Sequence, residues 1–173
     1  MDKGKSISSE IINRFEHSLG NLETSLHELK QMVQHIVPES LYHHGLKDTL
    51  HHFCTELKHI HAKEIVFQFF GEFNRLEHEF EIVVFHIVHE LIHNALKHSG
   101  AEEFLVQLIQ EPSRLCLIIQ DNGSGFDYNN LQNNRGKGLA YVYSYVNAHR
   151  GQIAFSSNPG IGTEITIEFP LKF

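Results

Sequence analysis

The sequence predicts an α+β fold: a two-layer sandwich in which helices cover one face of a mixed, mainly antiparallel sheet, preceded by a long amphipathic helix. Three observations predict this class. Apolar residues recur at helical spacing through the first 36 residues. Short runs rich in β-branched and aromatic residues follow later in the chain, and turn residues separate them.

Composition narrows the functional classes. The 173 residues carry 14 Lys and Arg against 21 Asp and Glu, a formal charge of −7, so we expect no nucleic-acid partner. We expect no membrane contact by this chain and a cytoplasmic location, because long apolar runs and a secretion signal are lacking. These observations do not bear on whether a longer parent protein is anchored in the inner membrane. Cys54 and Cys116 stand in apolar stretches, which predicts buried free thiols.

The first predicted element is one helix over residues 6–36. Its apolar residues alternate in steps of three and four, the spacing of a bundle seam, and Pro38 ends the helix. We expect the seam to pack against another copy, with packing on its own chain as the alternative. The seam consists of Ile12, Phe15, Leu19, Leu22, Leu26, Leu29, Val33 and Ile36.

Residues 39–173 form the second predicted domain, and residues 1–38 the first. Apolar residues on one side predict a helix over 46–61, and the run EIVFQFFGEF predicts a strand over 64–73. Residues 79–98 predict a largely buried helix that Gly100 ends.

The last elements alternate strands with one helix. Two apolar runs joined around Pro112 predict an antiparallel hairpin, and a second pair joined around 158–160 predicts another. A glycine-rich loop and a helix stand between the hairpins. In chain order these strands and this helix are expected at 104–110, 114–120, 138–149, 153–157 and 163–169.

The segment HELIHNALKH carries the first candidate chemistry. Glu90, Asn94 and either Lys97 or His98 recur at spacings of three and four, so they share one helix face. Glu90 and Asn94 supply the hard oxygens that suit Mg²⁺, and Lys97 supplies a charge for phosphate. The alternative is a solvated polar face on a buried helix.

Two glycine-rich loops contain the remaining candidate binding residues. In DNGSGF, Asp121 ends a strand and can accept from a base amino group, while Gly123 and Gly125 permit positive φ and close backbone approach. In RGKGLAYV, Gly136 and Gly138 precede a helix whose N-terminus can bind phosphate. Each loop alone is a common motif, and an ordinary turn is the alternative for the first.

Together these segments resemble, in order and spacing, the N, G1 and G2 boxes of the GHKL superfamily of Bergerat-fold ATPases. They most resemble the catalytic domain of bacterial sensor histidine kinases. The stretch from Arg150 to Pro170 looks like that family's final hairpin, with Gly162 and Thr163 as its GT pair. The stretch QHIVPESLYHHGLKDTLHHFC is similar to the join between dimerisation helices and catalytic domain in the nitrate and desaturase sensor kinases.

The resemblance implies ATP and Mg²⁺ as cofactors and a role for each matching residue. Asn94 would hold Mg²⁺ between the phosphates, with Glu90 assisting through the ion's hydration shell or as a polarising base. Lys97 and His98 would lie near the phosphates, and Glu90, Asn94 and Lys97 would form the catalytic group. Asp121 would select adenine by accepting from its exocyclic amine.

The same resemblance implies the extent of the ATP site. The glycines would shape the pocket and a short mobile lid over residues 127–135, and Thr163 would support Asp121 through its hydroxyl or a bound water. The implied ATP-binding residues are Asn94, Lys97, His98, Asp121, Gly123, Gly125, Phe126, Gly136, Lys137, Gly138, Leu139 and Thr163.

A phosphoacceptor histidine is expected outside this chain. In the family an acidic residue follows that histidine, and His27, His78 and His89 each precede a glutamate. His89 belongs to the metal-binding helix and His78 to the connection before it. His27 leaves too few residues before Pro38 for a turn and a second helix. We therefore expect residues 6–36 to be the second dimerisation helix only, and a chain that binds ATP without phosphorylating itself.

The implied function is transfer of the ATP γ-phosphoryl group to a histidine on a partner dimerisation helix, for relay to a response regulator. The full-length protein would be a homodimer through the N-terminal helix. The alternatives are a GHKL-type serine kinase or ATPase, or a degenerate dimerisation module that does not use ATP. For a histidine-rich region we favour a surface role, with a zinc site or a pH sensor as the alternatives. This region consists of His43, His44, His51, His52, His59 and His61.

Overall fold

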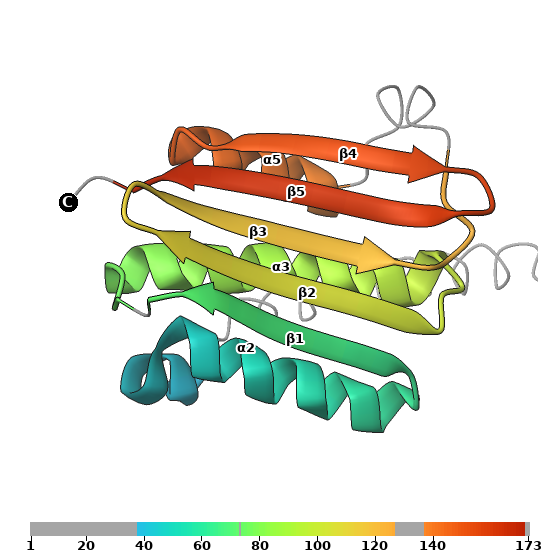
Figure 1. The fold of residues 1–173 in the computed structure, drawn as a ribbon, viewed down its shortest axis with the longest axis horizontal. Helices are drawn as coiled ribbons and strands as arrows, with labels where there is room; N and C mark the ends of the chain where they lie inside the picture. The colour runs from blue at the N-terminus through green and yellow to red at the C-terminus, as the bar shows by residue number, and fades with distance from the viewer. Residues whose placement is uncertain (1–37, 73, 127–136, 172–173) are drawn as a thin grey trace, which may run out of the picture. The chain divides into compact units, whose positions relative to one another are not determined.

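The computed structural model describes residues 38–72, 74–126 and 137–171 (Figure 1). Residues 38–173 form a unit separate from residues 1–37, and the fold is that of the second unit. The predicted helix over 6–36, its dimer seam and the predicted lid lie outside the described residues and stay predictions.

The described residues form an α+β fold built on a five-stranded sheet with strand order β1-β2-β3-β5-β4. Strands β1 and β2 pair in parallel, and the other neighbours pair antiparallel. The predicted mixed, mainly antiparallel sheet is therefore confirmed. In chain order the elements are α2 (Glu39–His61), β1 (Glu64–Gly71), α3 (His78–His98), β2 (Glu103–Glu111), β3 (Arg114–Asp121), α5 (Lys137–Ala148), β4 (Gln152–Asn158) and β5 (Gly162–Pro170).

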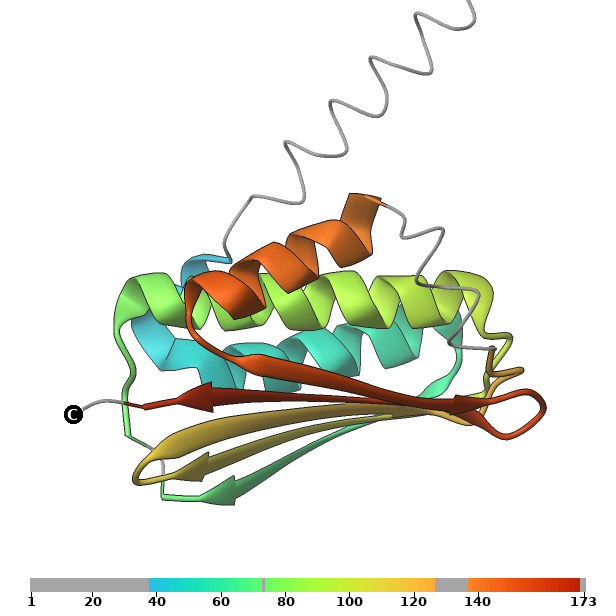
Figure 2. The same cartoon turned by 90° about the horizontal axis from the view of Figure 1, so that it is seen from above.

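The three labelled helices lie together on one face of the sheet, as Figure 2 shows. Helix α3 lies between α2 and α5 and contacts β3, while α2 packs along β1 and α5 along β4. In β2, and in β5 from Ile165 onward, every second side chain turns toward the helices and is buried. This period of two is what a sheet with one covered face requires.

The core fills the space between α3 and the three central strands. Burying each of these side chains contributes roughly 1.5–3 kcal/mol before the entropy of ordering it is counted. Both cysteines are buried and free, as predicted. The core side chains include Val84, Ile87, Val88, Leu91, Ile92, Val106, Leu108, Leu115, Leu117, Ile119, Ile167 and Phe169.

Helix α2 differs from its prediction at its start. The predicted helix begins at Leu46, whereas the structure begins at Glu39 and breaks the helix at Gly45, with φ 79° and ψ 179°. Glycine adopts that backbone without a Cβ penalty. The other predicted boundaries agree with the structure within two residues, and Gly100 follows α3 with φ +65° as a helix-ending glycine should.

An ion pair between the half-exposed Arg75 and the buried Glu81 connects the first turn of α2 to α3. The Glu81 side chain is fully buried, and Arg75 Nε donates to its Oε2 at 3.1 Å. The guanidinium also donates to the backbone carbonyls of Leu41 and Tyr42, at 2.7 and 3.1 Å. Arg75 therefore holds the start of α2 on the N-terminal turn of α3.

Candidate functional site

A cavity of about 350 Å³ lies between the C-terminal half of α3, the loop after β3, the first turn of α5 and strands β4 and β5. Its volume falls in the range of small-ligand pockets, and apolar walls with a few converging polar groups are typical of them. The lining residues are Leu91, Asn94, Ala95, His98, Ser99, Asp121, Ser124, Gly125, Phe126, Gly138, Leu139, Phe155, Thr163 and Ile165.

A second hollow of about 500 Å³ lies over the face of the sheet opposite the described helices. It is larger, but its walls come from strands and their connecting turns alone, and carboxylates such as Glu64, Glu103 and Glu164 line it. The cavity beside α3 gathers polar groups from two helices, a loop and a strand pair. We therefore take that cavity as the candidate site.

Helix α3 brings Asn94 into the cavity with a fixed side-chain orientation. The Asn94 Nδ2 group donates to Glu90 Oε1, one turn earlier, at 2.8 Å. Because this bond uses the amide nitrogen, the amide oxygen of Asn94 remains for a ligand. Glu90 itself does not line the cavity and acts on it through Asn94.

The first turn of α5 closes on the Glu90 carboxylate. A Cβ atom at Gly138 would lie 1.6 Å from Glu90 Oε1 and 2.6 Å from its Cδ. Only glycine therefore leaves the carboxylate in place. Leu139, the next residue, lines the cavity from α5.

Asp121, the last residue of β3, adds a carboxylate to the lining of the cavity. The backbone N–H of Gly123 donates to Asp121 Oδ1 at 2.9 Å, and the Ser99 hydroxyl also bonds the carboxylate. Burial raises the pKa of Asp121, and these two hydrogen bonds partly offset that rise. Strand register sets Thr163 of β5 directly opposite Asp121.

The two loop glycines have different reasons for being glycine. Gly125 has φ +60°, and a Cβ there would lie 2.1 Å from the Asn158 carbonyl oxygen. Gly123 has no positive φ, so the predicted conformational reason is wrong there. A Cβ at Gly123 would instead lie 2.4 Å from the Ser99 carbonyl oxygen, because the loop packs on the end of α3, where Ser124 N–H donates to that oxygen at 2.8 Å.

The structure brings most of the predicted binding residues together. Gly123 does not line the cavity, and its N–H bonds the Asp121 carboxylate, which does. Lys97 is exposed on α3 and does not line the cavity. Gly136 and the side chain of Lys137 lie outside the described residues. The predicted residues that line the cavity are Asn94, His98, Asp121, Gly125, Phe126, Gly138, Leu139 and Thr163.

Sequence reasoning missed Ser99, Phe155 and Ser157. Ser99 ends α3 and bonds Asp121, while Ser157 lies opposite Thr163 in the β4–β5 pair. Phe155 lines the cavity. Strand alternation offers a signal for Phe155 and Ser157, because both share the inward face of β4 with Ile153.

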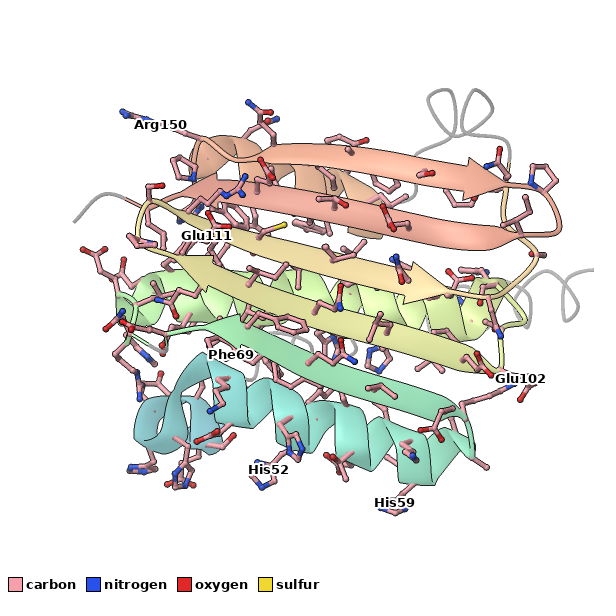
Figure 3. The ribbon with its side chains drawn as sticks, viewed as in Figure 1. His52, His59, Phe69, Glu102, Glu111 and Arg150 are labelled. Atoms are coloured by element: carbon pink, nitrogen blue, oxygen red, sulfur yellow. The ribbon has the colours of Figure 1, made fainter. Side chains whose placement is uncertain are left out.

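Among the described residues, Asn94 offers an amide oxygen that suits a metal ion in the cavity, and Glu90 orients that amide. Across residues 38–72, 74–126 and 137–171, no three His, Cys, Asp or Glu side chains are close enough together to hold a metal ion. The histidines of α2 are exposed, and Figure 3 shows His52 and His59 pointing away from the sheet. Within the same described parts, no helix is both long and apolar enough to cross a bilayer.

Comparison with known proteins gives one family and several named relatives. The family model for histidine kinase-, DNA gyrase B- and HSP90-like ATPases matches residues 80–173. The signal transduction histidine-protein kinase/phosphatase DegS of Bacillus subtilis is 33% identical over 183 aligned positions, which cover 95% of this chain and 47% of DegS. DegS of Brevibacillus brevis is 26% identical, with 95% and 46% covered. The chain spans about half the length of these curated relatives.

Solved structures show the same fold. The histidine kinase domain of the Erythrobacter litoralis EL346 blue-light activated histidine kinase superposes with a TM-score of 0.60 at 22% identity, covering 73% of this chain and 61% of that one. The catalytic domain of histidine kinase ThkA superposes with a TM-score of 0.53 at 14% identity, covering 72% and 89%. At these identities the likeness concerns the fold.

Proposed function

Because this chain belongs to the family of histidine kinase-, DNA gyrase B- and HSP90-like ATPases, whose member domains bind ATP, we propose that it is the catalytic portion of a sensor histidine kinase. It transfers the ATP γ-phosphoryl group to a histidine on a dimerisation helix, for relay to a response regulator. Two relatives named as signal transduction histidine kinases, which match 95% of this chain, support the proposal. The subgroup of sensor kinases stays a prediction.

The α3 residues that line the cavity suit the phosphates and Mg²⁺. Mg²⁺ prefers oxygen ligands, and the hydrogen bond from Asn94 Nδ2 to Glu90 leaves the hard amide oxygen of Asn94 free for the ion. Mg²⁺ bound there would neutralise phosphate charge. Asn94 would hold the ion, Glu90 would orient Asn94, and His98 would line the phosphate path. Lys97 would reach the phosphates from the exposed side of α3.

The surroundings of Asp121 in the cavity suit the adenine base. An ionised carboxylate has about four acceptor sites, and Asp121 uses two of them for Gly123 N–H and the Ser99 hydroxyl, so it can still accept from the exocyclic amine. Thr163, directly opposite Asp121, supports it. Apolar side chains such as Leu91 and Ile165 cover the faces of the base and exclude water.

The observation that carries the proposal is that one cavity is lined both by Asn94, whose amide is oriented by Glu90, and by Asp121. One ligand can therefore meet the amide oxygen of Asn94, which suits a cation, and the carboxylate of Asp121, which suits an amine. The protein would supply position and charge stabilisation to phosphoryl transfer. Homodimerisation through residues 6–36, absence of membrane contact by this chain, and cytoplasmic location belong to the same proposal.

Phosphoryl transfer in trans tests the proposal. The full chain is incubated with ATP labelled at the γ-phosphate and a separately prepared dimerisation domain that carries the acceptor histidine. We expect label on that domain, lost in acid as a phosphohistidine is, and lost in Asn94→Ala. Asn147→Ala, at an exposed position of α5, is the matched control and keeps transfer. Acid-stable label would favour the serine-kinase alternative, and equal transfer by Asn94→Ala would contradict the role of Asn94.

A further inference from the structure

A row of hydroxyl groups stands beside Asp121 on the cavity side of the sheet. Strand register sets Ser157 opposite Thr163 and Thr163 opposite Asp121, so the three lie side by side across β4, β5 and β3. Ser157 Oγ lies 3.0 Å from Thr163 Oγ1. Asp121 and Thr163 line the cavity, and Ser157 stands behind Thr163.

Hydrogen-bond counting fixes the direction of these hydroxyls. Phe126 N–H donates to Ser157 Oγ at 2.9 Å, so it occupies one acceptor site of that oxygen. The Gly162 carbonyl oxygen, at 3.2 Å from Ser157 Oγ, can only accept. Ser157 has one proton, and directing it to Gly162 lets both of these contacts be hydrogen bonds, because Thr163 can donate in turn, whereas directing it to Thr163 would leave the Gly162 contact without a proton. The remaining acceptor site of Ser157 then takes the proton of Thr163.

The Thr163 hydroxyl therefore presents a hydrogen-bond acceptor to the cavity, because its only proton points to Ser157. Asp121 is an acceptor as well when ionised. A base that carries an exocyclic amine offers two N–H donors to this pair, directly or through a bridging water. A base with a keto oxygen at the same place would meet two acceptors, which repel it.

We propose that Ser157 is a positioning residue for nucleotide selectivity: it fixes the Thr163 hydroxyl as an acceptor and thereby favours a 6-amino purine over a 6-keto purine. The inference rests on the proposed ATP site. It assigns to Ser157 no contact with the base, since the effect passes through Thr163.

Binding of ATP and ITP tests the role of Ser157, because the two nucleotides differ only at one edge of the base: ATP has a 6-amine beside an unprotonated N1, and ITP has a 6-keto oxygen beside an N1–H. The full chain and its variants are titrated with each. We expect Ser157→Ala to lower the preference for ATP about threefold to tenfold, the worth of one hydrogen bond, since Thr163 can then turn its proton toward a keto oxygen. Ser157→Thr keeps the hydroxyl and should restore the preference.

The matched control is Ser156→Ala, a neighbouring serine on the opposite face of β4 that lines the other hollow; it should leave the preference unchanged. A merely structural role for Ser157 would weaken ATP and ITP by the same factor, and that result would overturn the inference. Should Ser157→Ala not fold, Thr163→Val decides: weaker ATP binding with ITP unchanged supports the acceptor role, and an unchanged preference rejects it. A folded wild-type chain that binds neither nucleotide would instead reject the proposed function.

Discussion

Gly138→Ala should separate the stability of the domain from the function of its site. A Cβ at this position would lie 1.6 Å from Glu90 Oε1, where real Cβ contacts are essentially never under 3.0 Å. The carboxylate is the far end of a flexible side chain, so it moves away and the fold survives. That movement breaks the 2.8 Å hydrogen bond from Asn94.

The expected change in stability is small because two terms oppose each other. Alanine in place of glycine in a helix contributes up to about 1 kcal/mol, and loss of the Asn94–Glu90 hydrogen bond costs about 1 kcal/mol. The melting temperature should therefore shift by less than about 4 °C. Affinity for ATP in the presence of Mg²⁺ should fall about tenfold, because Asn94 loses the partner that orients its oxygen.

A double-mutant cycle with Glu90→Ala tests the mechanism. The affinity of each variant for ATP is measured by calorimetry with and without Mg²⁺, and melting is followed by circular dichroism. If Gly138 acts by making room for the Glu90 carboxylate, Gly138→Ala should have no further effect once Glu90 is alanine. Equal losses in both backgrounds would refute the reasoning, as would normal Mg²⁺-dependent affinity in Gly138→Ala.

Two further predictions concern stability. Arg75→Met should cost about 2–3 kcal/mol in chemical denaturation, because it leaves the fully buried Glu81 carboxylate without its cation; an unchanged midpoint would contradict the ion pair's importance. Burial, then His93 and His86, lower the pKa of His89 from 6.5 to about 4. As the pH falls, His89 therefore binds a proton in the unfolded chain before it does so in the folded chain. The free energy of unfolding is highest above pH 6.5 and falls toward pH 4, by at most about 2 kcal/mol after solvent screening. His89→Phe, which retains a ring against Phe53, should reduce this loss, and an unchanged pH profile would count against it.

The fold of the described residues was predictable because its elements have strong periodic patterns. The inward residues of β2 and β5 alternate cleanly, and Gly100 marks the end of α3. The start of α2 was not predictable, because residues 39–44 before Gly45 are mostly polar and, with Leu41 as their one aliphatic residue, are too few to show an apolar period. Their helical turn is held by Arg75, a contact distant in sequence.

The site was predictable where its chemistry lies in one segment. Asn94 and His98 share a helix face, and Asp121 ends a strand before a glycine-rich loop. The reason for Gly123 and the roles of Ser99 and Ser157 depend on contacts between distant segments. Pairing β5 between β3 and β4 is what sets Ser157 beside Thr163, and spacing within one segment cannot show it.

Calorimetric titration of the folded chain with ATP and GTP, each with and without Mg²⁺, tests most directly whether the cavity is an adenine-selective ATP site. We predict saturable binding of ATP, tighter with Mg²⁺, and weak or no binding of GTP. Asp121→Asn should lose that preference while keeping or raising thermal stability, because burial disfavours the ionised carboxylate. Equal affinity for both nucleotides, or normal ATP affinity in Asp121→Asn, would contradict base recognition by Asp121.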